Sequence, residues 1–240
     1  MLFLFFACNN NILQTTGELG RINYTLETSF SVGDERLDQV KLAVGYPHNI
    51  SASLTFDGWK MVETEPYKVY HSSPDGLELD AESVFDGAVG VPSFTVIASQ
   101  AGEYLVESHF EDALVDQIHL DFVQPDAVSV LSWIREPTSE EFVLFEGDEI
   151  PVVLGSQAAF VPVPEFQGER IVGELDVEIT VVPETAAVVG YNIESVSEDG
   201  VSFNSSPASI YFMEEGPVSI LAKDLINQVE TEQKFVVQSQ

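Results

Sequence analysis

The four histidines of this chain are its first candidates for chemistry, because a neutral imidazole is a common metal ligand. All of them lie in the first half of the sequence, at His48, His71, His109 and His119. Carboxylates stand close to the last two, at Glu111, Asp112 and Asp121. Zinc needs three or four ligands that converge on one point, and closeness along a strand does not supply that convergence. We therefore expect ordinary surface histidines and no metal ligands.

Calcium is the better ion hypothesis, because its sites are built from oxygen ligands and carboxylates are abundant here. The candidates are two turns of like sequence and two acids near the middle of the chain: Gly33-Asp34-Glu35, Gly147-Asp148-Glu149, Asp121 and Asp126. No D-x-[DN]-x-[DN]-G loop occurs in the sequence. The alternative, which we favour, is solvated turn carboxylates that hydrogen-bond their own backbone. Calcium is the one cofactor that stays open.

A group of aromatic residues offers a surface for carbohydrate stacking. Phe56, Trp59, Tyr67 and Tyr70 lie within one stretch, with Pro66 between them. Aromatic residues in strands more often pack in a core or pair across strands. We expect packing here and keep sugar binding as the alternative.

Catalytic signatures are missing from the sequence. It contains no G-x-S-x-G, H-E-x-x-H, G-x-x-x-x-G-K-[ST], G-x-G-x-x-G or C-x-x-C motif. Paired carboxylates carry no weight either, because 40 acidic residues bring some pair to glycosidase separation by chance. We expect no catalytic residue and a protein that is not an enzyme.

The N-terminus gives the single cysteine a different role. An apolar run at residues 1–7 precedes Cys8, and the chain turns polar directly after it. A bilayer span takes about 20 residues, so this run is too short to cross one. Ala7-Cys8 resembles the lipobox of bacterial lipoproteins, which implies that Cys8 is lipidated and that residues 1–16 are a signal remnant and tether. The alternative is an apolar N-terminal strand with a buried free thiol.

Short runs of alternating or β-branched apolar residues fill the rest of the chain, and a sustained 3.6-residue period is absent. Clear examples lie at residues 22–26, 94–98, 118–122 and 175–181. Turn signals with glycine separate such runs in both halves, as at Asp75-Gly76 and Asp199-Gly200. Many short strands at this spacing predict an all-β sandwich.

The chain also resembles itself at one offset. Three pairs of landmarks lie 114 residues apart: Gly33-Asp34-Glu35 and Gly147-Asp148-Glu149, Gly102 and Gly216, and Val123-Gln124 and Val237-Gln238. A fixed offset indicates two copies of one structural unit. The joint falls near Gln124-Pro125-Asp126, because proline cannot donate to a continuing ladder. The sequence therefore predicts units at residues 17–124 and 125–240.

The end of each unit carries a family resemblance. Residues 101–108 and 215–227, the latter followed by Lys234-Phe235-Val236-Val237, resemble the last two strands of bacterial immunoglobulin-like domains. The resemblance implies two tandem immunoglobulin-like β-sandwiches, in which Gly102 and Gly216 begin the penultimate strands. It also implies that Ala222-x-Asp224-x-x-Asn227 is the turn before the last strand. Tyr104 is then the candidate for the tyrosine corner of such sandwiches, and Val218 occupies the equivalent position in the second unit. Trp133 is expected in the core.

The charge of the chain restricts its partners. It has 40 Asp and Glu against 9 Lys and Arg, a formal net charge of −31, while 45% of its residues are hydrophobic. The hydrophobic fraction supports a folded core, and the shortage of basic residues excludes nucleic acid and anionic lipid headgroups as partners. The acids are spread over both units, so we expect an acidic coat whose self-repulsion salt relieves.

These observations lead to one leading functional expectation. We expect a non-catalytic, exported bacterial protein at the outer membrane, cell surface or periplasm, held to the membrane only by a lipid on Cys8. Its role would be adhesion, assembly or spacing, with an unknown protein or glycan partner. The alternative is a calcium- or carbohydrate-binding accessory module of an extracellular system. The sequence leaves the oligomeric state open.

Overall fold

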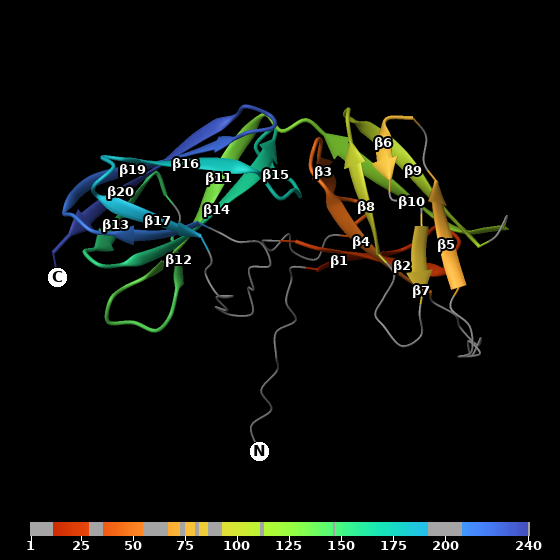
Figure 1. Cartoon of the computed structure of the whole chain (residues 1–240), viewed down its shortest axis with the longest axis horizontal. Helices are drawn as coiled ribbons and strands as arrows, with labels where there is room; N and C mark the ends of the chain where they lie inside the picture. The colour runs from red at the N-terminus through yellow and green to blue at the C-terminus, as the bar shows by residue number, and fades with distance from the viewer. Residues whose placement is uncertain are drawn as a thin grey trace, which may run out of the picture.

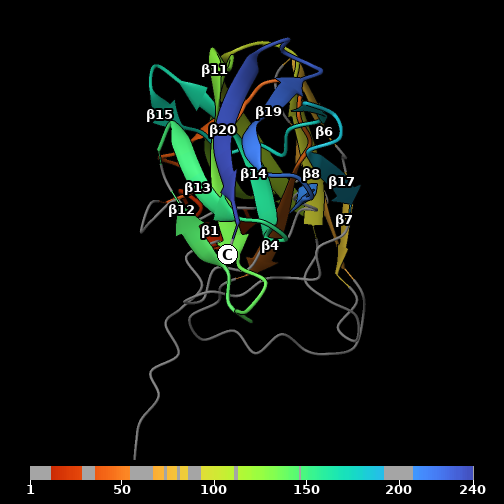
Figure 2. The same cartoon turned by 90° about the vertical axis from the view of Figure 1, so that its left-hand side faces the viewer.

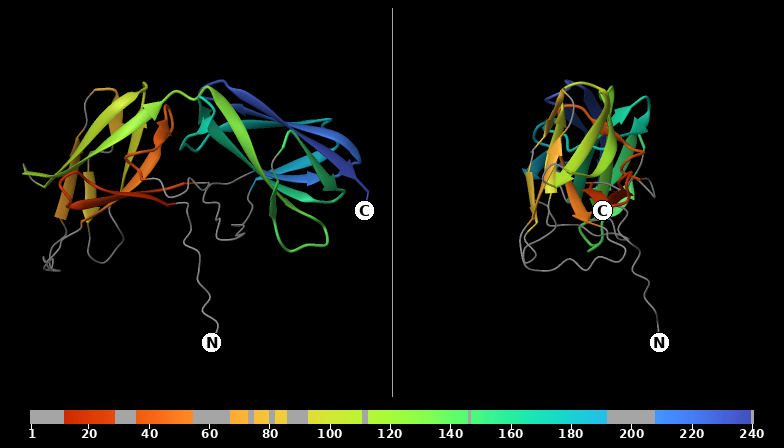
Figure 3. Two further views of the ribbon diagram at one scale, coloured as in Figure 1. Left: turned by 180° about the vertical axis from the view of Figure 1, so that it is seen from behind. Right: turned by 90° about the vertical axis from the view of Figure 1, so that its right-hand side faces the viewer.

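The computed structural model describes residues 12–28, 36–54, 67–72, 75–79, 82–85, 93–110, 113–145, 147–191 and 208–239. Every regular element among them is a β-strand, and this part of the chain has no helix with the length and apolarity of a membrane span. The strands form two β-sandwiches that lie end to end (Figure 1). In the view along the long axis the C-terminal sandwich lies in front of the other (Figure 2), and the view from behind shows the same end-to-end arrangement (Figure 3).

The first sandwich contains ten strands, whose bounds are β1 (Ile12–Thr16), β2 (Ile22–Glu27), β3 (Lys41–Ala43), β4 (His48–Leu54), β5 (Tyr67–Ser72), β6 (Leu77–Leu79), β7 (Glu82–Phe85), β8 (Ser93–Ala98), β9 (Gly102–Phe110) and β10 (Ala113–Val123). One sheet has the order β1-β2-β4-β8-β6, and the other has the order β3-β10-β9-β5-β7.

Alternating burial explains why these two sheets pack face to face. In β2, Ile22, Tyr24 and Leu26 are buried and alternate with more exposed residues. Phe122 of the opposite sheet belongs to the same buried cluster. The Tyr24 hydroxyl and Ser108 Oγ, one from each sheet, lie 2.8 Å apart. A polar contact therefore joins the layers inside an otherwise apolar core.

The second sandwich contains the other ten strands, whose bounds are β11 (Ala127–Arg135), β12 (Val143–Phe145), β13 (Glu149–Val153), β14 (Gln157–Phe166), β15 (Glu169–Arg170), β16 (Val177–Val182), β17 (Ala187–Tyr191), β18 (Ala208–Phe212), β19 (Gly216–Asp224) and β20 (Glu230–Gln238). One sheet has the order β12-β11-β14-β18-β17, with β15 beside β14, and the other has the order β13-β20-β19-β16.

Both sandwiches have an immunoglobulin-like strand arrangement. In each, a short strand runs parallel to the last strand, β3 beside β10 and β13 beside β20. The order β2-β4-β8-β6 opposite β3-β10-β9-β5 in the first sandwich matches β11-β14-β18-β17 opposite β13-β20-β19-β16 in the second. The prediction of an all-β chain with two tandem immunoglobulin-like β-sandwiches is confirmed.

The tyrosine corner is present in the first sandwich. The Tyr104 hydroxyl donates to the carbonyl oxygen of Gln100 at 2.9 Å, which ties β9 to the turn that precedes it. The Tyr104 ring also meets Phe122 edge to face, with 5.7 Å between the centroids. Val218 at the equivalent position of β19 is buried in the second core. The same position is therefore used for packing in both units.

The 114-residue offset holds for the second half of each unit and drifts in the first half. Gly102 begins β9 and Gly216 begins β19, as predicted. Phe122 and Val236, which are 114 apart, pair with Leu42 and Pro151, which are only 109 apart. The turn at Gly33-Asp34-Glu35 lies outside the described residues. An alignment of the two units therefore requires a gap between the early strands and the late strands.

The first sandwich begins earlier than predicted, which corrects the assignment of residues 1–16 to a tether. Ile12–Thr16 form β1, with Leu13 and Thr15 buried, and β1 pairs with β2 as an antiparallel hairpin. The buried Asp116 carboxylate fixes the hairpin turn, because it accepts the backbone N–H groups of Leu19 at 2.8 Å and Ile22 at 2.7 Å. Cys8 and the rest of residues 1–11 lie outside the described residues.

Trp133 is buried, as expected, on the face of its sheet that points away from the main core. It is 4% exposed and packs in a small cluster that includes Leu131, Phe142 and Val161. Ile134, the next residue, turns to the other face and joins the core between the sheets. β11 is therefore covered on both faces.

Candidate functional site

The junction between the two sandwiches contains the most specific contacts of the described chain. Only Gln124, Pro125 and Asp126 separate β10 from β11. A parallel β-bridge nevertheless joins Leu42 of β3 to Val172 of the second sandwich. The N–H of Ala43 donates to the carbonyl oxygen of Val172 at 2.8 Å, and the N–H of Val172 donates to that of Lys41 at 2.9 Å. These bonds pair the outer edge of β3 with the neighbouring sandwich.

An apolar cluster lies directly beside this bridge. It comprises buried and half-buried residues from both sandwiches: Ala43, Tyr46, Val123, Ile171, Phe166 and Leu175. Lys41 covers its margin, with Nζ 5.1 Å from the Phe166 ring centroid and 3.5 Å from a carboxylate oxygen of Glu169. Burial of apolar surface between the sandwiches stabilises one fixed arrangement of the two.

Two glycines permit this close approach. A Cβ at Gly173 would lie 2.7 Å from Cβ of Ala43, so a side chain there would push the 172–174 segment off β3. Gly45 has φ of +86°, and a Cβ there would lie 2.8 Å from Cγ2 of Ile226. Glycine is required at Gly45 by backbone conformation as well as by space.

Tyr46 and Asp224 form the polar centre of the junction. The Tyr46 hydroxyl donates to Oδ1 of Asp224, and it accepts from Nδ2 of Asn227 at 3.1 Å. Tyr46 is 1% exposed and Asp224 is fully buried. Burial, reinforced by the Asp224 carboxylate, raises the pKa of Tyr46 above its ordinary value. The phenol is therefore neutral and acts as the donor to a buried carboxylate.

The turn implied by the family resemblance presents this carboxylate. Asp224 Oδ1 accepts the backbone N–H of Ile226 at 2.9 Å, and Asp224 Oδ2 accepts Nδ2 of Asn227 at 3.0 Å. Gln124 of the linker donates from Nε2 to Oδ1 of Asn227. The Asp224 and Asn227 of the predicted motif therefore cap the β19–β20 turn and contact the first sandwich.

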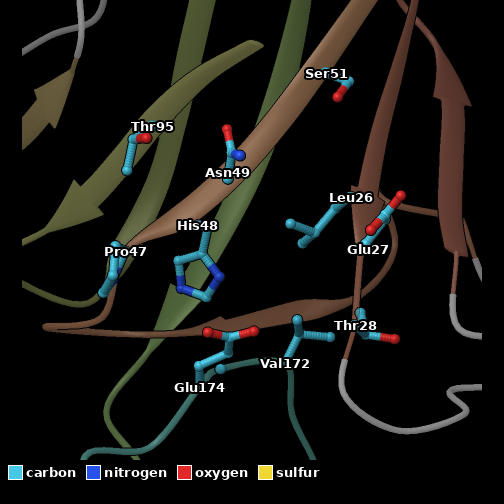
Figure 4. Close-up of a pocket in the computed structure, with 11 residues that line it drawn as sticks. Leu26, Glu27, Thr28, Pro47, His48, Asn49, Ser51, Thr95, Val172 and Glu174 are labelled. Carbon is cyan, nitrogen blue, oxygen red and sulfur yellow. The ribbon is translucent and has the colours of Figure 1, made fainter. Parts of the chain in front are cut away.

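A cavity of about 470 Å³ lies next to the junction (Figure 4). Strands β2, β4 and β8 of the first sandwich form most of its wall, and the 172–174 segment of the second closes one side. Its lining includes Leu26, Glu27, His48, Val172 and Glu174. The cavity is therefore a feature of the pair of sandwiches and not of either one.

His48 is the buried titratable group of this cavity. Its Nε2 lies 3.0 Å from the carbonyl oxygen of Ala43, and its ring meets Phe122 edge to face at 5.5 Å. Burial lowers the pKa of His48 to about 4. The expectation of a surface histidine is wrong here, because the inward face of β4 directs this side chain into the junction. His48 is neutral at physiological pH.

His109 and His119 make separate contacts with acidic residues. His109 Nε2 lies 3.2 Å from Glu107, whereas His119 Nε2 lies 2.9 Å from Glu18 on the β1–β2 turn. The described part of the chain contains no group of three His, Cys, Asp or Glu side chains placed to hold a metal. His71 lies in β5, where only the backbone is described, and Glu111 and Asp112 lie outside the described residues.

The calcium candidates are used locally. The carbonyl of Gly147 accepts Nε2 of Gln233 at 2.9 Å, and Asp126 accepts the backbone N–H of Gln167 at 3.0 Å. Asp121 lies on β10, opposite Lys41 in the strand register. Asp126 thus bonds a backbone N–H 41 residues away and not its own turn, so solvated turn carboxylates and calcium binding both stay predictions.

The predicted aromatic group cannot be placed as a surface. Tyr67 and Tyr70 lie on β5, where their backbones pair with Phe85 and Glu82 of β7. Phe56 and Trp59 lie outside the described residues, as does Cys8. Carbohydrate stacking and lipidation therefore stay predictions.

Sequence reasoning missed Tyr46, Gly173 and Glu174. Tyr46 and Asp224 are 178 residues apart, and no local pattern links them. The usable signal is a glycine directly after a valine, in Val44-Gly45 and Val172-Gly173, since glycine within a strand-like run marks close backbone approach.

The fold and junction define an all-β chain of two tandem immunoglobulin-like sandwiches in direct contact. No protein-family model matches the sequence, and no curated protein sequence matches it. Solved structures do match in fold, at low similarity.

A C-terminal 282-residue fragment of intimin, solved with the intimin-binding domain of the translocated intimin receptor, is 13% identical with a TM-score of 0.33. The Escherichia coli adhesin FdeC is 15% identical with a TM-score of 0.31. Each match covers 83% of this chain and 61% of the other, so the chain spans about three-fifths of those structures. Domains 5–6 of the S-layer protein SbsC are 16% identical with a TM-score of 0.33, and the match covers 90% of this chain and 100% of that one.

Proposed function

We propose that this protein is a non-catalytic, exported module of a bacterial surface that acts as a rigid spacer or adhesion unit. The observation that supports this role is the junction, where a β-bridge, an apolar cluster and the Tyr46–Asp224 contact hold two sandwiches end to end. A fixed pair of sandwiches sets a distance and presents loops at its ends. Its partner is a protein or a glycan.

The rigidity is tested by small-angle X-ray scattering of the whole protein. We expect the wild-type profile to fit one arrangement of the sandwiches, and Gly173→Val to give a larger radius of gyration because its side chain displaces the bridge. Gly190→Val on β17 is the matched control, because φ is not positive there and a Cβ would have no neighbour closer than 3.8 Å. A wild-type profile that requires many interdomain angles would rule out the rigid spacer.

We also propose a lipid anchor at Cys8 and two units that divide near Gln124–Asp126. Ala7-Cys8 supports the anchor, and the rarity of strand pairing across the junction supports the division. Mass spectrometry of the N-terminus from native cells tests the anchor, because an unmodified Cys8 with intact residues before it would refute it. Separate expression of residues 12–124 and 125–239 tests the division, because each piece should fold alone if it is a unit with its own core.

The calcium- or carbohydrate-binding alternative is tested separately. A cation at a hundred times its dissociation constant raises stability by about 2.7 kcal/mol, so a melting curve with and without calcium distinguishes the two cases. A glycan array performs the same test for sugars. Binding in either experiment would favour an accessory module over a spacer.

A further inference from the structure

The cavity at the junction is lined by hydrogen-bond acceptors and by no positive charge. Glu27 and Glu174 bring carboxylates, and neither Lys nor Arg is among the lining residues. Leu26 and Val172 add apolar surface, and His48 lies between Pro47 and the centre of the cavity (Figure 4). The lining favours a positively charged ligand with an apolar part.

The hydrogen bond of His48 decides what its ring offers to the cavity. The carbonyl oxygen of Ala43 only accepts, so the Nε2 atom 3.0 Å away carries the hydrogen. In a neutral imidazole this leaves Nδ1 as a bare acceptor. The side chain is 3% exposed and makes no other hydrogen bond in the described part of the chain. Nδ1 is thus an acceptor on the wall of the cavity, and a ligand N–H can donate to it.

The backbone holds Glu174 at the margin of the same cavity. Val172 bonds to β3 through both its N–H and its carbonyl oxygen, and Gly173 packs against Ala43. Figure 4 shows the His48 ring and the Glu174 carboxylate among the groups that line the cavity. Glu174 makes no hydrogen bond or ion pair within the described residues. An acceptor and a negative charge thus line one cavity before any ligand arrives.

We propose that this cavity binds a primary ammonium group on a short alkyl chain. The ammonium donates one N–H to Nδ1 of His48 and another to the Glu174 carboxylate, and the alkyl chain lies against Leu26 and Val172. The three N–H donors match these acceptors, and the positive charge offsets that of Glu174. A neutral hydroxyl compound would leave the Glu174 carboxylate without a counter-charge. This inference stands apart from the proposed surface role, which concerns the ends of the sandwiches.

Two isomeric cations test the proposal on the whole protein. Butylammonium and tetramethylammonium have the same atoms and charge, but only butylammonium has N–H donors. At equal ionic strength, we expect calorimetric titration to show butylammonium binding about tenfold more tightly, as a charge-assisted hydrogen bond requires. Glu174→Gln removes the charge from an exposed position and should weaken butylammonium by about the same factor.

Glu184→Gln is the matched control, because Glu184 is an exposed turn residue that does not line the cavity. It should leave the affinity for butylammonium unchanged. Equal binding of the two isomers, or equal weakening by the two variants, would show diffuse attraction to the acidic coat and would overturn the proposal. The absence of saturable heat with butylammonium would overturn it as well.

Discussion

The hydroxyl of Tyr46 in the first sandwich donates to the carboxylate of Asp224 in the second, and both residues are buried. A buried carboxylate is costly unless its acceptor sites are filled. Asp224 fills some of them within its own turn and one from the other sandwich. If the sandwiches separated, the Asp224 carboxylate would lose the hydrogen bond from Tyr46. The contact therefore favours the docking geometry in which that hydrogen bond forms.

Replacing Tyr46 with phenylalanine should destabilise the protein by about 1–3 kcal/mol, because one acceptor site of a buried carboxylate loses its donor. Urea unfolding measures the change. Tyr211→Phe is the control, since Tyr211 is 42% exposed on β18 and its change should stay within about 0.5 kcal/mol. Equal midpoints for the two variants would show that the Tyr46 hydroxyl contributes nothing.

The Tyr46–Asp224 pair should also be coupled in a double-mutant cycle. Tyr46→Phe and Asp224→Ala each remove one partner of the same contact, so the double variant should lose less than the sum of the single losses, by about 0.5–3 kcal/mol. Urea unfolding of the four proteins gives this coupling. Strict additivity would mean that the two residues act independently.

A methyl group at Gly173 should disrupt the β-bridge, because its Cβ would lie 2.7 Å from Cβ of Ala43. We expect Gly173→Ala to cost about 1–3 kcal/mol, as overpacking usually does. Adding Ala43→Gly removes the opposing methyl and should recover part of that loss. Thermal melting of the two single variants and the double variant checks this. A double variant with no recovery would show that steric conflict at Ala43 is not the cause.

The stability of the protein should fall in mild acid through His48. Its folded pKa of about 4 lies below the ordinary 6.5, so the unfolded chain binds the proton first as pH falls. The contribution is complete above pH 6.5 and is lost as pH falls towards 4. Its full size is about 3 kcal/mol. Phe122, Glu27 and Glu174 lie around the ring or line the same cavity.

His48→Phe isolates this effect from the titration of the carboxylates. The variant keeps an aromatic ring and loses the titrating group, so wild type minus variant stability should decrease as pH falls from 7 to 4. Urea unfolding at several pH values measures the difference. A pH-independent difference would place the acid sensitivity elsewhere.

Salt should stabilise the fold. With a net charge of −31, like charges repel across both sandwiches. Their screening length shortens from about 30 Å at 0.01 M to about 3 Å at 1 M ionic strength. We expect the melting temperature to rise over this range in NaCl. No rise would mean that the charges are spaced too widely to matter.

The strands could be predicted because their signals are local. The run at residues 94–98 lies within β8, and the 114-residue offset places Gly102 and Gly216 at the starts of β9 and β19. Alternation reports a buried face wherever one side of a sheet is covered. β1 escaped prediction because its alternation is short and follows the apolar run that ends at Cys8.

The junction could not be predicted, because its partners are distant in sequence and ordinary in type. The family resemblance predicts that Asp224 lies in a turn, but nothing in the sequence indicates that Tyr46 contacts it. The sequence predicts a surface position for His48, because a single His on a strand gives no sign of the face that it occupies. Close approach at Gly173 depends on a methyl of Ala43, which only three-dimensional packing reveals.

The parallel pairing of β13 with β20 has a mechanical consequence. A pull between the chain before β13 and the end of β20 drags the two parallel strands past each other lengthwise. The ladder from Glu149 and Lys234 to Val153 and Gln238 is then loaded in shear, so its bonds share the force and must rupture together. β3 and β10 have the same geometry. Each sandwich is thus built to bear tension along the axis on which the two are joined.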